Sequence, residues 1–185
     1  MASNRRQFLK HSGVVLSIAV AGEVLLLSPA EARAAEMPLQ VLSAQEAATL
    51  EALGEALVPG AREAGIAQYI DKQLAVAPQD SLLMLKYLGV PFADYTAFYR
   101  GGLAAAALLA QTRAGKPWLS LDASETRAVL EAMASDDAAD WLGPPAPFFH
   151  FVIRSDACDV TYGTEAGFAT IGMPYMAHIA PPQPW

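Results

Sequence analysis

Two helix-start signals, separated by turns rich in proline and glycine, constrain the fold of this chain more than any other feature. Ser43-Ala44-Gln45-Glu46 is a capping box, in which the serine hydroxyl accepts the amide three residues on and the glutamate reaches back. Asp122-Ala123-Ser124-Glu125 resembles a second box. Apolar residues follow each box at the spacing of an amphipathic helix. The sequence therefore predicts an all-α fold.

The other segments extend this pattern to a compact bundle of about five to six helices. Proline or glycine ends most of the segments, as expected where helices stop. Gly101-Gly102 interrupts the longest candidate helix, and such a pair permits close approach of a neighbouring helix or a partner chain. The predicted helices cover approximately residues 43–57, 65–76, 80–88, 94–112, 122–133 and 148–156.

A leader precedes the helical region. Its basic residues are followed by a weakly apolar run, residues 13–27, which is interrupted by Glu23 and is shorter than the roughly 20 residues of a membrane span. The basic part fits the twin-arginine export signal, which a receptor reads and which carries folded proteins across the bacterial inner membrane. The residues that fit this signal are Arg5, Arg6, Phe8, Leu9 and Lys10.

The leader ends in two small-residue cleavage options, Ala30-Glu31-Ala32 and Ala32-Arg33-Ala34. We therefore expect residues 1–34 to be a twin-arginine signal peptide outside the fold, the twin-arginine translocase to be a partner, and the protein to be periplasmic. The alternative is an ordinary secretory signal, whose positively charged region can contain two adjacent arginines by chance.

Composition limits the classes of partner. The whole chain has a formal net charge of −7, and removing the leader makes the remainder more acidic, with no cluster of lysine or arginine. Nucleic acid is therefore not an expected partner. The chain is 54% hydrophobic, which hints at more apolar surface than a solitary small domain hides. Cys158 is the only cysteine, so an internal disulfide is excluded, and we interpret it as a small buried apolar residue.

The sequence changes character after a helical domain at residues 35–158. Glycine and proline predict an extended tail at residues 159–185, yet the tail keeps large apolar side chains that a solvated segment rarely has. These side chains either fold back on the domain or lie in a groove of another protein, and aromatic and methionine residues commonly anchor interfaces. We predict as partner-binding residues Tyr162, Tyr175, Met176, His178, Ile179 and Trp185.

A search for chemistry finds no phosphate loop, dinucleotide loop or nucleophile elbow. His150 is interpreted as a core or interface histidine, and His178 as an interface hydrogen-bonding group. Asp136, Asp137 and Asp140 lack the glycine and closing glutamate of a calcium loop. The sequence thus predicts no catalytic, cofactor-binding or metal residue in this chain. Carboxylates expected on helix surfaces are Glu63, Asp71, Glu125 and Glu131.

The order of motifs behind the leader resembles the gluconate 2-dehydrogenase subunit 3 family. The segment from Leu53 to Ile66, LGEALVPGAREAGI, is similar to the family's opening, and Tyr69-Ile70-Asp71-Lys72-Gln73-Leu74 also fits. Asp159 with Tyr162-Gly163, then Gly167 and Ile171-Gly172-Met173-Pro174, looks like its closing motif. The resemblance covers most of the chain after the leader.

This resemblance implies an accessory role. The chain would be the non-catalytic small subunit, in a heterodimer, of a periplasmic dehydrogenase whose large subunit, of the glucose–methanol–choline type, binds FAD and oxidises a sugar, sugar acid or alcohol. The small subunit would support folding, stability and export of that flavoprotein. A cytochrome c subunit often belongs to such complexes, and the complex offers a route to membrane association. No cofactor is expected in this chain itself.

Two other interpretations of the residues stay open. One is a free-standing periplasmic enzyme, for example a hydrolase, that uses His150 or His178. The other is a helical module that binds a small apolar ligand. Activity of the chain alone would indicate the first, and a ligand bound to the monomer would indicate the second.

Overall fold

The computed structural model describes residues 16–20, 23–135 and 137–174. Within these ranges it contains eight helices, five of them with seven or more residues, and a single two-stranded sheet. The predicted all-α class is confirmed. The elements are β1 (Leu16–Val20), β2 (Glu23–Leu27), α2 (Pro29–Ala34), α3 (Ala44–Leu57), α4 (Ile66–Ala75), η1 (Pro78–Asp80), α5 (Met84–Tyr87), η2 (Phe92–Asp94), α6 (Tyr95–Ala114), η3 (Trp118–Ser120), α7 (Ala123–Ala134), α8 (Ala146–Tyr162) and α9 (Glu165–Thr170).

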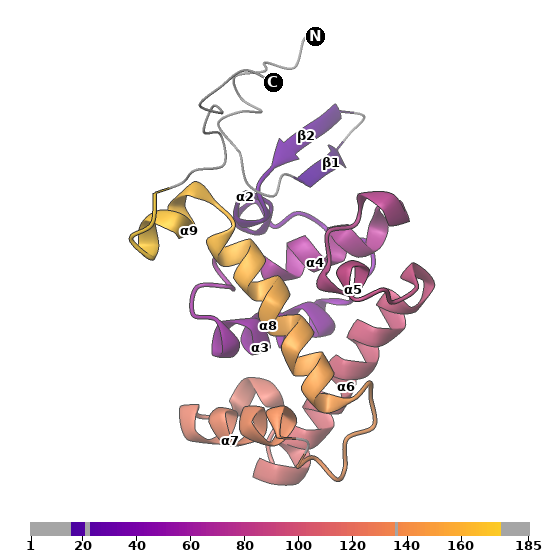
Figure 1. The fold of residues 1–185 in the computed structure, drawn as a ribbon, viewed down its shortest axis with the longest axis vertical. Helices are drawn as coiled ribbons and strands as arrows, with labels where there is room; N and C mark the ends of the chain where they lie inside the picture. The colour runs from indigo at the N-terminus through magenta and orange to yellow at the C-terminus, as the bar shows by residue number, and fades with distance from the viewer. Residues whose placement is uncertain (1–15, 21–22, 136, 175–185) are drawn as a thin grey trace, which may run out of the picture.

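Helix α8 organises the bundle. Figure 1 shows it crossing the middle of the molecule, with α7 near its N-terminal end and α9 at its C-terminal end. It contacts α3, α4, α5 and α6 as well. The antiparallel pair β1–β2 leads into α2, which packs against α4. One helix therefore touches nearly every other helix of the bundle.

Both predicted capping boxes are present. The Ser43 hydroxyl accepts the Glu46 amide at 3.2 Å, and Glu46 Oε2 accepts the Ser43 amide at 2.7 Å. At the start of α7, Asp122 Oδ1 accepts the Glu125 amide at 2.9 Å while Glu125 Oε2 accepts the Asp122 amide at 2.9 Å. These bonds satisfy amides that have no partner within the helix, so local sequence alone positions both helix starts.

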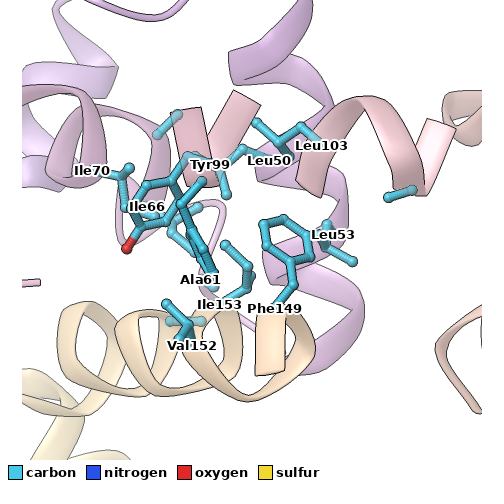
Figure 2. Packing of buried hydrophobic residues seen from close by; sticks show 14 of the residues in the cluster. Leu50, Leu53, Ala61, Ile66, Ile70, Tyr99, Leu103, Phe149, Val152 and Ile153 are labelled. Atoms are coloured by element: carbon cyan, nitrogen blue, oxygen red, sulfur yellow. The ribbon is translucent and has the colours of Figure 1, made fainter. Parts of the chain in front are cut away.

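The core forms where α3, α4, α6 and α8 meet. Figure 2 shows the ring of Phe149 entering from α8 among apolar side chains of the other helices. Apolar residues of α3, α4 and α6 are buried here, and this burial is the main source of stability for helices of this length. The labelled members are Leu50, Leu53, Ala61, Ile66, Ile70, Tyr99, Leu103, Phe149, Val152 and Ile153.

The glycine pair of α6 allows this close packing. An ideal Cβ placed on Gly102 would lie 2.1 Å from Phe149 Cε2 and 2.2 Å from Phe149 Cδ2, whereas one on Gly101 would meet only Pro144 Cδ at 3.6 Å. The ring of Phe149 is fully buried and has no free space to move into. The close approach expected of the pair is therefore made by Gly102, against a neighbouring helix of the same chain.

The structure corrects the expected end of the helical region. Residues 159–162 continue α8, and Glu165–Thr170 form α9, where the sequence predicts an extended tail from Asp159. Asp159, Thr161 and Gly163 are weak helix formers, but Val160 is buried against the core, and this burial outweighs propensity. The predicted extended segment at residues 175–185 lies outside the described residues.

The start of the fold also differs from the sequence-based expectation. Residues 1–34 are predicted to lie outside the domain, yet α2 falls within them and packs against α4, and Ala32 is completely buried. Residues 5–10, which carry the predicted export signal, lie outside the described residues.

Substitution of the two glycines separates close packing from helix propensity. We expect Gly102→Ala to lower the free energy of unfolding by about 1–3 kcal/mol, because its Cβ overlaps the Phe149 ring. The matched variant Gly101→Ala is expected to raise it by up to about 1 kcal/mol, because alanine favours the helix and has room. Urea unfolding followed by circular dichroism measures both, and equal effects would contradict the packing argument.

Candidate functional site

Of the predicted partner-binding residues, the structure places one. Tyr162 lies in the last turn of α8, half-buried against the core. The other five, Tyr175, Met176, His178, Ile179 and Trp185, lie outside the described residues. Tyr162 is therefore positioned by the domain itself, at the junction between α8 and α9.

Exposed apolar side chains continue beyond the end of α9. Ile171 and Met173, which lie between α9 and Pro174, are 48% and 55% exposed. The chain leaves α9 through a defined turn, in which the Met173 amide donates to the Phe168 carbonyl at 3.0 Å and Gly172 has a φ of 70°. The direction of the chain at the start of the tail is thus set by backbone hydrogen bonds.

Other exposed apolar side chains lie elsewhere on the described surface. Leu82, Tyr87 and Leu88 flank or belong to the short helix α5, and Leu142 stands in the connection between α7 and α8. Single exposed apolar residues are common on any protein, whereas a group around one short helix is the kind of surface that partners bind. The α5 group and the α9 end are therefore the apolar contact candidates in the described residues.

A buried carboxylate joins three helices inside the bundle. Asp156 of α8 is 0% exposed; its Oδ2 accepts the Tyr99 hydroxyl of α6 at 2.5 Å, and its Oδ1 accepts the Met84 amide of α5 at 2.9 Å. Tyr69 lies nearby on α4 and donates its hydroxyl to the Leu82 carbonyl at 3.3 Å. This polar centre holds α5 against α6 and α8.

Burial governs the ionisation of this centre. It raises the pKa of Asp156 to about 7, an effect that the hydrogen bonds from Tyr99 and Met84 reduce and that nearby Asp159 increases. Burial also raises the pKa of Tyr99, so this hydroxyl keeps its proton and donates to the carboxylate. The sequence does carry a signal that Asp156 is buried, because the residue stands at helical spacing among Val152, Ile153 and Val160. Asp156 is nevertheless not among the residues predicted above.

A second buried carboxylate corrects an expectation. Asp71 is predicted as a helix-surface charge but is only 4% exposed. Its Oδ1 accepts the Val41 and Leu42 amides and its Oδ2 accepts the Gln40 amide, each at 2.8 Å. These amides precede α3 and therefore have no carbonyl acceptor within a helix. The Asp71 carboxylate, which comes from α4, accepts their hydrogen bonds instead. The sequence gives no local signal for such a pairing across thirty positions.

An open hollow of about 480 Å³ lies between α3, η3 and α7. Its walls carry charges of both signs, and Glu55 accepts the backbone amides of Gly60 and Arg62 at 3.1 Å. Because the charges are mixed, the hollow does not favour an anion or a cation. Its lining residues are Ala52, Glu55, Ala56, Arg62, Trp118, Leu119, Leu121, Asp122, Ala123, Thr126, Arg127 and Leu130.

The remaining candidates for chemistry are dispersed. His150 is half-buried on α8, and burial, followed by the charge of Arg154, lowers its pKa. Cys158 is partly buried, and burial raises the pKa of its thiol, which disfavours the reactive thiolate. Within the described residues, no three His, Cys, Asp or Glu side chains gather as a metal site would require. Among the helices of the same ranges, none has the length and apolarity needed to cross a membrane.

The fold and these sites describe a small helical bundle with buried structural carboxylates and apolar surface groups. A family model described as Gluconate 2-dehydrogenase subunit 3 matches residues 44–178, from α3 through α9 and into the predicted tail. The chain therefore belongs to the gluconate 2-dehydrogenase subunit 3 family, as its motifs predict. Members of this family are subunits of a dehydrogenase complex. No curated protein and no solved structure matches the chain.

The buried Asp156 makes a testable contribution to pH-dependent stability. Its pKa is raised in the folded state, so between about pH 4 and pH 7 the folded chain binds more protons at this site than the unfolded chain. Stability from this site is complete below pH 4 and is lost as pH rises to 7, at a slope of at most about 1.4 kcal/mol per pH unit.

We expect Asp156→Asn to remove this slope, because the amide stays neutral and keeps an oxygen for the Met84 amide. The difference in unfolding free energy between wild type and variant, measured by urea unfolding from pH 4 to pH 8, isolates the site. Asp140→Asn changes the same charge at an exposed position and is expected to follow the wild type. A constant difference between wild type and Asp156→Asn across this range would contradict the assignment.

Proposed function

We propose that this chain is the non-catalytic small subunit of a periplasmic, FAD-dependent dehydrogenase of the glucose–methanol–choline type. Its membership of the gluconate 2-dehydrogenase subunit 3 family carries the proposal. The large flavoprotein subunit binds FAD and oxidises a sugar, sugar acid or alcohol, and a cytochrome c subunit takes the electrons in complexes that contain one. The small subunit stabilises the flavoprotein and carries it through export.

The nature of the buried polar groups supports a structural role for this chain. Asp156 and Tyr99 are both 0% exposed, so no substrate reaches Asp156, whose pKa burial raises to about 7. Asp71 is occupied by three backbone amides. Both carboxylates are used to join segments of the bundle, which suits a subunit that presents a rigid surface to a partner.

The surface near the C-terminal end of the bundle supports partner binding. Tyr162, Ile171 and Met173 bring apolar and aromatic area to the two sides of α9, within the segment predicted as the tail. The family match runs on to residue 178, so it includes Tyr175, Met176 and His178. In this proposal these residues, with Ile179 and Trp185, anchor the tail to the flavoprotein.

A variant of the leader tests the proposed export by the twin-arginine route. In a strain that produces this chain with its flavoprotein, we expect Arg5→Lys with Arg6→Lys to lower periplasmic FAD-bearing dehydrogenase about tenfold or more, because the receptor reads the arginine pair. Fractionation followed by FAD fluorescence and dye-linked activity measures this. The double variant Arg127→Lys with Arg154→Lys makes the same chemical change at exposed helical positions and serves as the control. Normal periplasmic activity in the leader variant would count against the export role.

The tail is tested by deleting residues 174–185. We expect the deletion to reduce co-purification of a yellow, FAD-bearing large chain with the tagged subunit, because it removes the predicted aromatic and methionine anchors. Helix content by circular dichroism is expected to stay near that of the full chain, since the core residues of the described ranges all precede this segment. Equal loss of helix content and of co-purification would show that the tail belongs to the core. Turnover by the purified subunit alone would instead favour a free-standing enzyme.

A further inference from the structure

The helix α2 lies within the predicted leader and is capped at both ends. At its start, the Ser28 hydroxyl accepts the Glu31 amide at 3.2 Å and Glu31 Oε2 accepts the Ser28 amide at 2.7 Å, with Pro29 in the first turn. Leu27, just before the cap, packs on Ala32. This combination of a capping box with an apolar contact across it is a strong helix-start signal.

The end of α2 is equally defined. The Met37 amide donates to the Ala32 carbonyl and the Glu36 amide to the Arg33 carbonyl, each at 3.0 Å, and Glu36 has a φ of 49°. Met37 also packs on Ala32. This is the Schellman arrangement, which satisfies the last carbonyls of a helix. The segment therefore has its own local reasons to be helical, although it is short.

Tertiary contacts hold α2 on the folded domain. Gly65, the residue before α4, lies against the backbone of Pro29 so closely that a Cβ there would be 2.2 Å from the Pro29 carbonyl oxygen. Arg33 pairs with Glu51 of α3 at 3.2 Å and with Glu63 at 3.3 Å. Ala32 is 0% exposed. Helix α3 and the segment that precedes α4 thus both contact this small helix.

Both small-residue cleavage options fall on this helix. A peptidase that requires small side chains two residues apart needs them on one side of an extended chain, because alternate residues share a face only in that conformation. In α2 the same residues point in different directions. Ala32 belongs to both options and is buried. Cleavage therefore requires α2 to leave the domain and unfold.

We propose that docking of α2 against Gly65, Glu51 and Glu63 protects the Ala32–Arg33 and Ala34–Ala35 bonds, so that the folded subunit keeps its leader. This inference rests on the proposed export of the chain in the folded state. A domain that folds before export presents α2 to the signal peptidase already docked. The leader then stays covalently attached to the subunit, and through it to the dehydrogenase complex.

The docking is tested on the purified full chain with two proteases. Trypsin reports exposure of the Arg33–Ala34 bond, and purified signal peptidase in detergent micelles reports cleavage after Ala32 or Ala34. We expect Gly65→Ala to be cut at these bonds about tenfold faster or more than the wild type, because the Cβ displaces α2. Residues 1–36 are unchanged in this variant, so recognition of the cleavage sequence is unchanged.

Two further variants control this experiment. Gly89 also has a positive φ, of 72°, so Gly89→Ala introduces the same kind of backbone strain as Gly65→Ala. Its Cβ would meet nothing within 4 Å, so we expect this variant to be cleaved at the wild-type rate. Glu51→Gln with Glu63→Gln removes the partners of Arg33 without backbone strain, and a rise of a few-fold is expected. This double variant replaces Gly65→Ala in the test if circular dichroism shows that Gly65→Ala does not fold. Equal cleavage of wild type and both docking variants would overturn the proposal.

Intact mass and N-terminal sequencing of the subunit from periplasm complete the test. A wild-type chain that retains residues 28–32 supports the proposal, and one that begins at Arg33 or Ala35 overturns it. A chain that stays in the cytoplasm, while its purified form resists both proteases, contradicts the proposed export and leaves the protection by docking established. Failure of the two proposals is thereby distinguished.

Discussion

The contact between Phe149 of α8 and the glycine backbone of α6 is the constraint on which the bundle depends. Because Gly102 has no side chain, the Phe149 ring lies on the α6 backbone itself, and Figure 2 shows it beside Leu53 of α3. That position makes α8 the common neighbour of the other helices. A larger residue at position 102 would push α8 outward and separate the faces that its apolar side chains join.

Two buried carboxylates, Asp71 and Asp156, join parts of the bundle by hydrogen bonds instead of apolar contacts. Asp71 accepts the amides that precede α3, and Asp156 accepts one amide of α5 and one hydroxyl of α6. Each satisfies groups that the local chain leaves without partners, which is the condition under which a buried charge or acid is tolerated. Both carboxylates therefore join segments of the chain inside the bundle.

Two regions of the surface matter to the proposed role. At one, α9 releases the chain through a hydrogen-bonded turn with Ile171 and Met173 exposed. At the other, α2 carries part of the predicted leader onto α4. In the proposed function the first region contacts the dehydrogenase partner, and in the further inference the docking of α2 decides the fate of the leader.

The sequence by itself determined the helix starts, the apolar faces and the family, because capping boxes, helical spacing and motif order are local properties of the chain. It also predicted the role of the glycine pair in close packing. Only the tertiary structure decided that Phe149 is the group that meets Gly102, that Asp71 is buried and that Asp156 joins three helices. It also decided that residues 159–162, 165–170 and 29–34 are helical parts of the domain. These outcomes depend on groups far apart in sequence, whose burial and pairing outweigh local propensity.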